Sequence, residues 1–229
     1  MKGNKQDLPL SVSEIANTPS RGGTLGSKRR PPNDARRSIL AAAERLFYAE
    51  GIGAVGVDAV AKAAGVTKRT LYYHFASKDD LAAAYLEARD EVTLNALRST
   101  QSDRGGLPGD LILSVFDFVE RWSATSNYRG CPFNNAVAEQ SASPKVTAIV
   151  RRHKATVKSW FAQRAAEGGA RQADEVGGQL LVLLDGAFNG AAVFGSAEAT
   201  VVARSVAEAV LDSAGVARSG RAKSNAARR

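Results

Sequence analysis

Apolar residues recur every three or four positions along most of this chain, and no strand-like alternation interrupts them. Because that spacing places apolar side chains on one side of a helix, it predicts an all-α body between two polar tails. One helix is expected to begin at Asn33 or Asp34 and to end before Gly51. Another is expected to begin near Ser77, because Asp80 follows at capping-box spacing. Further helices are expected over residues 110–125, 144–166, 175–194 and 197–213.

Small and apolar residues in the segment Val57–Phe75 have the spacing of a helix-turn-helix. Ala61 leaves room for the second helix to cross, Gly65 suits the tight turn, and Leu71 returns to the shared core. Thr67 stands where the N-cap of the second helix is expected. The segment therefore predicts two short helices that cross at a steep angle.

Two cations, Lys68 and Arg69, open this second helix, where positive charge opposes the helix dipole. Phosphates and base edges of DNA would remove that penalty, because the N-terminal residues of a recognition helix face the nucleic acid. The alternative is an ordinary helical hairpin whose lysine and arginine are solvated. The spacing alone leaves both interpretations open.

A longer stretch around this segment resembles the signature of the TetR/AcrR family of DNA-binding regulators. The matching residues are Gly51, Val57–Ala61, Ala64–Phe75 and Ser77–Leu81, within a region that runs from Asn33 to Leu86. The resemblance implies a three-helix DNA-binding domain, joined by a fourth helix to a larger ligand-binding and dimerisation domain. It also implies DNA contacts, mostly with phosphates for tyrosine and lysine, at Thr67, Lys68, Thr70, Tyr72, Tyr73, His74 and Lys78.

Two residues depart from the family pattern. Gly56 stands where a serine or threonine usually caps the first helix of the motif, and glycine is an acceptable N-cap. Arg69 stands where the family often has glycine. An arginine here either reads a guanine through two hydrogen bonds or holds a phosphate, so Arg69 joins the predicted DNA contacts.

The formal charge of +8 is concentrated in the tails rather than in the body. Residues 1–33 carry 6 basic and 2 acidic side chains, residues 216–229 carry 5 and 0, and residues 34–215 carry 20 and 21. The expected organisation is a disordered basic arm over 1–32, a DNA-binding domain over 33–93, an effector and dimerisation domain over 94–215 and a disordered basic tail over 216–229. The tails either attract phosphates or have no role.

No secretion signal or membrane span is expected, because polar residues interrupt the apolar stretches over 8–15 and 179–194. Cys131 is the single cysteine, which excludes intramolecular disulfides and paired-cysteine zinc sites and fits a reducing cytoplasm. Catalysis by Cys131 with His153 lacks a third, orienting group, so the protein is not expected to be an enzyme. Neither a metal nor a cofactor is expected.

The second half of the chain carries aromatic residues on helices of the buried type, which suits an apolar effector pocket with a few polar groups. Arg129–Asn135 is similar to a Gly-Cys-Pro-Phe segment that opens a central helix in one branch of the family. The candidate effector residues are Phe116, Trp122, Cys131, Asn134, His153, Trp160 and Phe188. Plain core packing is the alternative for each of them, including a buried, hydrogen-bonded His153 and a packed Cys131.

Residues 175–194 are apolar around most of the helix circumference, so one neighbour within the subunit cannot cover them. With residues 197–213 they are expected to form a dimer interface, as the resemblance also implies, in which Gly186 and Gly190 admit a partner helix. The expected function is a homodimeric repressor that binds a palindromic operator in double-stranded DNA and is released by a small-molecule effector. The alternative is a ligand-independent architectural DNA-binding protein.

Overall fold

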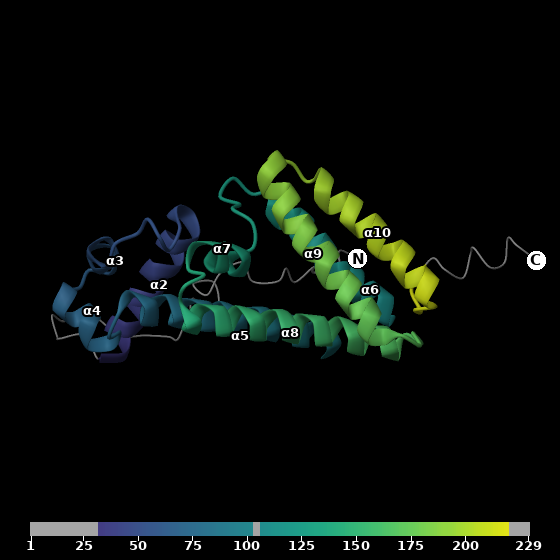
Figure 1. Ribbon diagram of the computed structural model, residues 1–229, viewed down its shortest axis with the longest axis horizontal. Helices are drawn as coiled ribbons and strands as arrows, with labels where there is room; N and C mark the ends of the chain where they lie inside the picture. Colours follow the sequence, from purple (N-terminus) through teal and green to yellow (C-terminus); the bar gives the residue numbers. More distant parts are fainter. Residues whose placement is uncertain (1–31, 103–105, 220–229) are drawn as a thin grey trace, which may run out of the picture. The chain divides into compact units, whose positions relative to one another are not determined.

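The computed structural model describes residues 32–102 and 106–219, and every regular element in these two ranges is an α-helix (Figure 1). The all-α prediction is therefore confirmed. The helices in chain order are α2 (Pro32–Glu50), α3 (Val57–Ala64), α4 (Lys68–His74), α5 (Lys78–Ser102), α6 (Pro108–Ser123), α7 (Pro132–Glu139), α8 (Pro144–Glu167), α9 (Ala173–Phe194) and α10 (Glu198–Ala214). The basic arm up to residue 31 and the tail from residue 220 lie outside the described residues.

The described residues fall into two compact units. The first unit consists of residues 32–94 and 132–150 and contains the helix-turn-helix formed by α3 and α4. It also contains α7 and the start of α8, which the sequence placed in the effector domain. Reading the chain as consecutive domains cannot anticipate a segment that returns to an earlier one.

The core of the first unit takes side chains from each of its first four helices. Ile39, Val60, Leu71 and Leu81 are fully buried, one from each of α2, α3, α4 and α5. The rings of Phe47 and Tyr85 meet edge to face, with centroids 5.8 Å apart. A buried ion pair, Arg89 Nη1 to Glu44 Oε1 at 3.1 Å, ties α5 to α2. These contacts fix the frame on which the short helices α3 and α4 rest.

The turn between α3 and α4 has the predicted local structure. Gly65 has a φ of 66°, and its N–H donates to the Lys62 carbonyl at the end of α3. Thr67 Oγ1 accepts a hydrogen bond from the N–H of Thr70 at 3.1 Å, so Thr67 is the N-cap of α4. Both predictions are confirmed, because this turn is determined by residues close together in the sequence.

Helices α2, α6 and α9 begin earlier than predicted, α9 at Ala173 instead of residue 175. Helix α2 begins at Pro32, so Asn33 and Asp34 lie within its first turn rather than at its cap. Helix α6 likewise begins at Pro108 instead of residue 110. Proline is favoured in a first turn because its missing N–H would have no partner there, and the Asp34 carboxylate complements the helix dipole.

The second unit consists of residues 95–102, 106–131 and 151–219 among those described. Helices α9 and α10 form an antiparallel hairpin through Gly195, and α6 packs against both (Figure 1). Phe116, Phe161, Leu180 and Leu211 are fully buried, one from each of α6, α8, α9 and α10. The unit is therefore a layered helical bundle with its own apolar core.

The two glycines predicted to admit a partner helix have different surroundings, although they lie four residues apart on one face of α9. A Cβ at Gly190 would lie 2.5 Å from the Cβ of Ala199, so Gly190 makes room for α10 of the same chain. A Cβ at Gly186 would meet no atom within 4 Å. The prediction for Gly190 was wrong, because the spacing does not reveal that α10 of the same chain already covers this face of α9 at Gly190 but not at Gly186.

Residues Val216–Ser219 pack against the helices of the second unit, although the sequence assigned them to a disordered tail. Val216 is fully buried, the N–H of Ala217 donates to the Gly168 carbonyl at 2.9 Å, and the N–H of Gly109 donates to the Ala217 carbonyl at 2.9 Å. Ser219 donates through both its N–H and its hydroxyl to the Asp110 carboxylate. The ordered chain therefore continues to Ser219.

Several large apolar side chains on α9 and α10 are exposed. They are Val182, Val193, Phe194, Val201, Val202 and Val206, and together they are called the α9–α10 face below. By length and composition alone α9 could cross a membrane, with 39% of its apolar window buried. That is weak evidence for a span, because a helix that packs against a partner subunit has the same composition.

Adjacent glycines on α9 provide a matched test of the packing of α8 against α9. A Cβ at Gly177 would lie 2.8 Å from the Lys158 carbonyl oxygen, whereas a Cβ at Gly178 would only touch the Lys158 side chain at 3.7 Å. We expect Gly177→Ala to lower the free energy of unfolding by about 1–3 kcal/mol through overpacking. Gly178→Ala should raise it by about 0.5–1 kcal/mol, because alanine favours helix. Urea unfolding of both variants at one protein concentration checks the opposite signs, and equal effects would contradict the close α8–α9 approach.

Candidate nucleic-acid interface

Helix α4 exposes most of its side chains and keeps one anchored in the core. Leu71 is fully buried, whereas Tyr72 is 43% exposed and Tyr73 is 81% exposed. Lys68 and Arg69 are also exposed. Exposed tyrosines beside cations are typical of a surface that meets a partner, because an aromatic ring left in water forgoes its burial energy.

The other predicted DNA-contacting residues of this segment are partly engaged within the protein. The hydroxyls of Thr67 and Thr70 lie 2.8 Å apart, in addition to the backbone cap. His74 is half-buried and lies edge-on to Tyr73, with ring centroids 5.2 Å apart. The structure thus brings the predicted residues from Thr67 to His74 together on one short helix and its cap.

Lys68 forms an ion pair that the sequence analysis did not anticipate. Its Nζ lies 3.0 Å from Asp58 Oδ2 in the first turn of α3, and both side chains are more than half exposed. The hydrogen bond to Asp58 raises the pKa of the Lys68 ammonium above its usual value. A phosphate that binds Lys68 would compete with this carboxylate for the ammonium group. The residue type of Asp58 was visible in the sequence, but its spacing of ten residues from Lys68 fits no helical pair.

Lys78 also has a partner inside the protein. Its Nζ donates a hydrogen bond to the Gly53 carbonyl at 3.1 Å, in the turn between α2 and α3. The family resemblance implies a DNA contact at this position, and the structure adds a role in holding that turn.

The Asp58–Lys68 pair leads to a prediction about non-specific DNA binding. Asp58→Asn should raise affinity for random duplex DNA by about twofold to fivefold, because an exposed ion pair is worth at most about 1 kcal/mol. Lys68→Ala should lower affinity for all sequences and reduce the slope of log affinity against log salt by about one. Fluorescence anisotropy across a salt titration measures both effects. Glu91 is an exposed carboxylate on α5, so Glu91→Gln is the charge-matched control. If Asp58→Asn bound random DNA no more tightly than this control, the proposed competition would be contradicted.

The candidate effector residues do not form one cluster. Trp122 lies edge-on to Phe188, with centroids 5.8 Å apart, and Phe116 stacks on Phe161 at 6.2 Å. Asn134 lies on α7 in the first unit, and the other candidates belong to the second unit. Phe116, Trp122, Cys131, His153, Trp160 and Phe188 are all buried. Their burial agrees with core packing as well as with an effector site.

Polar contacts around Cys131 and Trp122 were not foreseen. Lys154 Nζ lies 3.7 Å from Cys131 Sγ and also pairs with the Asp185 carboxylate. The Tyr128 hydroxyl donates to the Phe188 carbonyl at 2.8 Å, and its ring packs edge-on against Trp122. Among the described residues, no three His, Cys, Asp or Glu side chains come close enough together to hold a metal ion.

Comparison with known sequences points to one family. Residues 39–85 match the sequence model described as bacterial regulatory proteins, tetR family. The transcriptional activator FasR of Mycolicibacterium smegmatis is 34% identical over 151 residues, which are 61% of this chain and 66% of that protein. The transcriptional regulator TtgR of Pseudomonas putida is 34% identical over 88 residues, which are 37% of this chain and 42% of that protein. The alignments thus span less than two thirds of the length of either relative.

Solved structures match over a longer stretch. A TetR-family transcriptional regulator from Streptomyces coelicolor has a TM-score of 0.74 and 31% identity, covering 80% of this chain and 97% of that one. A regulator from Streptomyces avermitilis has a TM-score of 0.72 and 31% identity, covering 80% and 99%. These proteins share the helix-turn-helix and the larger helical domain predicted from the sequence. The chain therefore belongs to the TetR family of DNA-binding transcription regulators, which are not enzymes.

Proposed function

We propose that this regulator is a repressor that binds a palindromic operator as a homodimer and leaves it when a small-molecule effector binds. The observation that carries the proposal is the surface of α4, which exposes Lys68, Arg69 and Tyr73 while Leu71 anchors the helix. In this proposal α4 enters the major groove, and its tyrosines and lysine bind phosphates. The proposed DNA contacts are Thr67, Lys68, Arg69, Thr70, Tyr72, Tyr73, His74 and Lys78, the last of which already donates to Gly53.

The α9–α10 face supports dimerisation. One side of α9 carries Glu175, Gln179, Val182, Gly186, Asn189 and Val193, all exposed and spaced alternately by four and three residues. The exposed side of α10 carries Val202, Val206, Ala209 and Ser213 with similar spacing. A second subunit would bury these valines, and a symmetric pair of α9–α10 hairpins forms a four-helix bundle.

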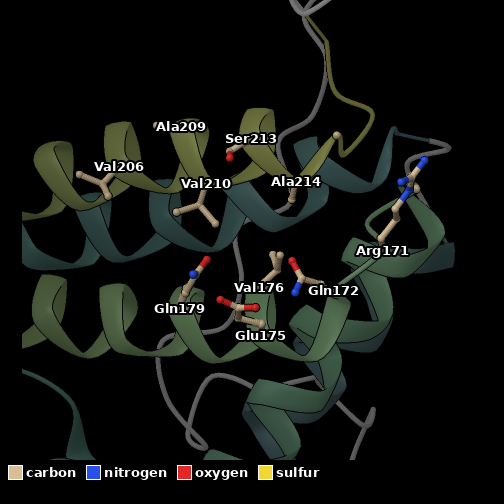
Figure 2. Close-up of a pocket in the computed structure, with 12 residues that line it drawn as sticks. Arg171, Gln172, Glu175, Val176, Gln179, Val206, Ala209, Val210, Ser213 and Ala214 are labelled. Atoms are coloured by element: carbon tan, nitrogen blue, oxygen red, sulfur yellow. The ribbon is translucent and has the colours of Figure 1, made fainter.

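An open groove of about 750 Å³ extends this face between the start of α9 and the end of α10 (Figure 2). Val206 and Val210 line its α10 side, and Glu175 and Gln179 line its α9 side. Interfaces commonly combine an apolar centre with a polar rim. We therefore assign the groove to the same dimer interface, where it receives part of the second subunit.

A two-fold dimer explains the proposed operator. Two copies of α4 related by such an axis would contact two half-sites about one helical turn of DNA apart, and the half-sites would be inverted repeats. An effector that prefers a conformation with a different separation of the two α4 helices would then release the DNA.

Two buried donors support an effector site on α8. Trp160 Nε1 and Arg164 Nε lie on successive turns, and neither has an acceptor among the described residues. A buried N–H without an acceptor costs about 1–3 kcal/mol. An apolar effector with a hydrogen-bond acceptor would remove this cost, which favours Trp160 as a contact. The remaining proposed contacts are Phe116, Trp122, Cys131, Asn134, His153 and Phe188.

The proposal places the protein in the cytoplasm, where its operator lies, and gives it a repressing effect. One relative, FasR, is named a transcriptional activator, so the direction has to be measured. A reporter gene behind the operator should be expressed more strongly in cells that lack the regulator. Lower expression in those cells would make the protein an activator.

The effector part is tested on the protein–operator complex. We expect one compound of a metabolite library to lower operator affinity at least about tenfold and to raise the unfolding midpoint of the free protein, as linkage requires. Trp160→Phe removes the indole N–H and should weaken the response to that compound while leaving operator affinity in its absence unchanged. A compound that displaces DNA without stabilising the protein would indicate direct competition at α4 instead.

A further inference from the structure

The turn between α2 and α3 has an unusual backbone, because it begins at a glycine in the left-handed region. Gly51 has a φ of 96°, where residues with a side chain are strained. It is buried, whereas Gly53 is exposed two residues later. The turn leads directly into α3, so its position sets where the helix-turn-helix begins.

Glu139, the last residue of α7, contacts both glycines of this turn. Its Oε2 accepts a hydrogen bond from the Gly53 N–H at 2.8 Å. A Cβ at Gly51 would lie 2.9 Å from both Glu139 carboxylate oxygens, so the carboxylate occupies the space that a side chain would need. Gly51 thus makes room for the carboxylate and Gly53 binds it through its N–H, although Glu139 is 86 positions away from Gly53 in the sequence.

Lys78, the first residue of α5, also binds this turn, through the carbonyl group of Gly53. Its Nζ donates to the Gly53 carbonyl at 3.1 Å. The N–H and the C=O of Gly53 are therefore bound by two charged side chains, one from α7 and one from α5. Such charge-assisted hydrogen bonds are shorter and stronger than those between neutral groups.

Further contacts hold Ser143 and the start of α8 against the first turn of α5. The Ser143 hydroxyl donates to Asp79 Oδ2 at 2.6 Å, and Lys145 Nζ lies 2.5 Å from Asp80 Oδ1. The hydrogen bond from Lys145, followed by that from Ser77, lowers the pKa of Asp80. A pocket of about 10 Å³, room for about one water molecule, lies between α7, α2 and α5 and is lined by Ala136, Phe47 and Tyr85 among others. Side chains of α7 therefore lie close to those of α2 and α5.

We infer that Glu139 is a positioning residue for DNA binding, which with Lys78 fixes Gly53 and so sets the start of α3 relative to α7. Glu139 does not touch DNA in this account. It acts through the turn that carries α3, and α3 carries the recognition helix. A change that restrains α7 consequently also restrains the helix-turn-helix, and the reverse holds too. This coupling does not depend on whether the protein responds to an effector.

Hydrogen exchange of the wild-type protein tests the coupling without any substitution. The probe is a duplex that the wild-type protein selects from random DNA. Bound DNA should slow amide exchange in α3 and α4 and also in residues 51–56 and in α7. Slowing confined to α3 and α4 would overturn the inference, since the turn and α7 would then move independently of the bound helices.

Substitutions test the role of the carboxylate itself. Glu139→Ala should raise the dissociation constant of the selected duplex by about threefold to tenfold, as loss of one solvent-accessible hydrogen bond allows. It should also reduce the DNA-induced slowing in α7. Glu139→Gln keeps an oxygen that can accept the hydrogen bond from the Gly53 N–H. It should therefore have the wild-type dissociation constant and the wild-type slowing of exchange in α7. If Glu139 acted only through its charge, Glu139→Gln would lose both. Glu91→Ala is the matched exposed glutamate and should leave both unchanged.

Three results would overturn the inference. They are wild-type affinity and wild-type slowing in Glu139→Ala, equal loss in Glu139→Gln, and equal loss in Glu91→Ala. If Glu139→Ala unfolds at a clearly lower temperature, the wild-type exchange experiment and the Glu139→Gln variant decide the question.

Discussion

Replacing Gly186 with tryptophan is expected to leave each subunit folded but to lower operator affinity by about 100-fold, because a monomer holds only one half-site. A side chain at Gly186 meets no atom of its own subunit within 4 Å, so the indole points into solvent in the monomer. Between two subunits the same indole blocks the close approach of the α9–α10 faces. Sedimentation velocity measures the association, and anisotropy with a labelled operator measures the affinity.

Two controls separate this effect from misfolding. Ala155→Trp places the same ring at an exposed position on α8 and should leave the dimer intact. Gly190→Trp should instead damage the subunit itself, because Gly190 faces Ala199 of α10. A Gly186→Trp protein that sediments as an unchanged dimer would move the interface to another surface.

Replacing Arg69 with alanine is expected to lower affinity for the selected operator at least about tenfold, because a bidentate arginine–guanine contact is worth about 1–3 kcal/mol. Arg69 is exposed in the first turn of α4, and no hydrogen bond or ion pair with another described residue engages its guanidinium. Unlike Lys68, it can therefore bind DNA without competition from an internal partner. Affinity for random DNA should change much less.

Binding-site selection distinguishes reading of a base from binding of a phosphate. With Arg69→Ala the preference at one base pair of each half-site should disappear, and the rest of the motif should remain. Lys68→Ala is the comparison, because loss of a phosphate contact weakens all sequences alike. An unchanged motif for Arg69→Ala would assign its guanidinium to the DNA backbone.

The helix-turn-helix could be predicted from the sequence because its determinants are local. Gly65 at the turn and Thr67 at the N-cap act within a few residues of where they stand, and the structure confirms both. The all-α class followed from the same kind of short-range periodicity. The family resemblance then supplied the arrangement of helices on either side of this segment.

Contacts between distant segments could not be predicted in this way. The Glu139–Gly53 hydrogen bond joins residues that are 86 positions apart, and no repeating pattern relates them. The Asp58–Lys68 pair links α3 and α4, and the sequence of neither helix specifies the angle at which they cross. The different surroundings of Gly186 and Gly190 depend on how α10 folds back on α9, which is a property of the hairpin rather than of the spacing.

The central claim, that α4 gives a dimer sequence-specific DNA binding, is tested most directly by binding-site selection followed by footprinting with the full-length protein. The account predicts one enriched palindrome with half-sites about one helical turn apart and a protected stretch of fixed length. Selection that enriches no sequence, with protection that lengthens as protein is added, would contradict it and would support an architectural DNA-binding protein.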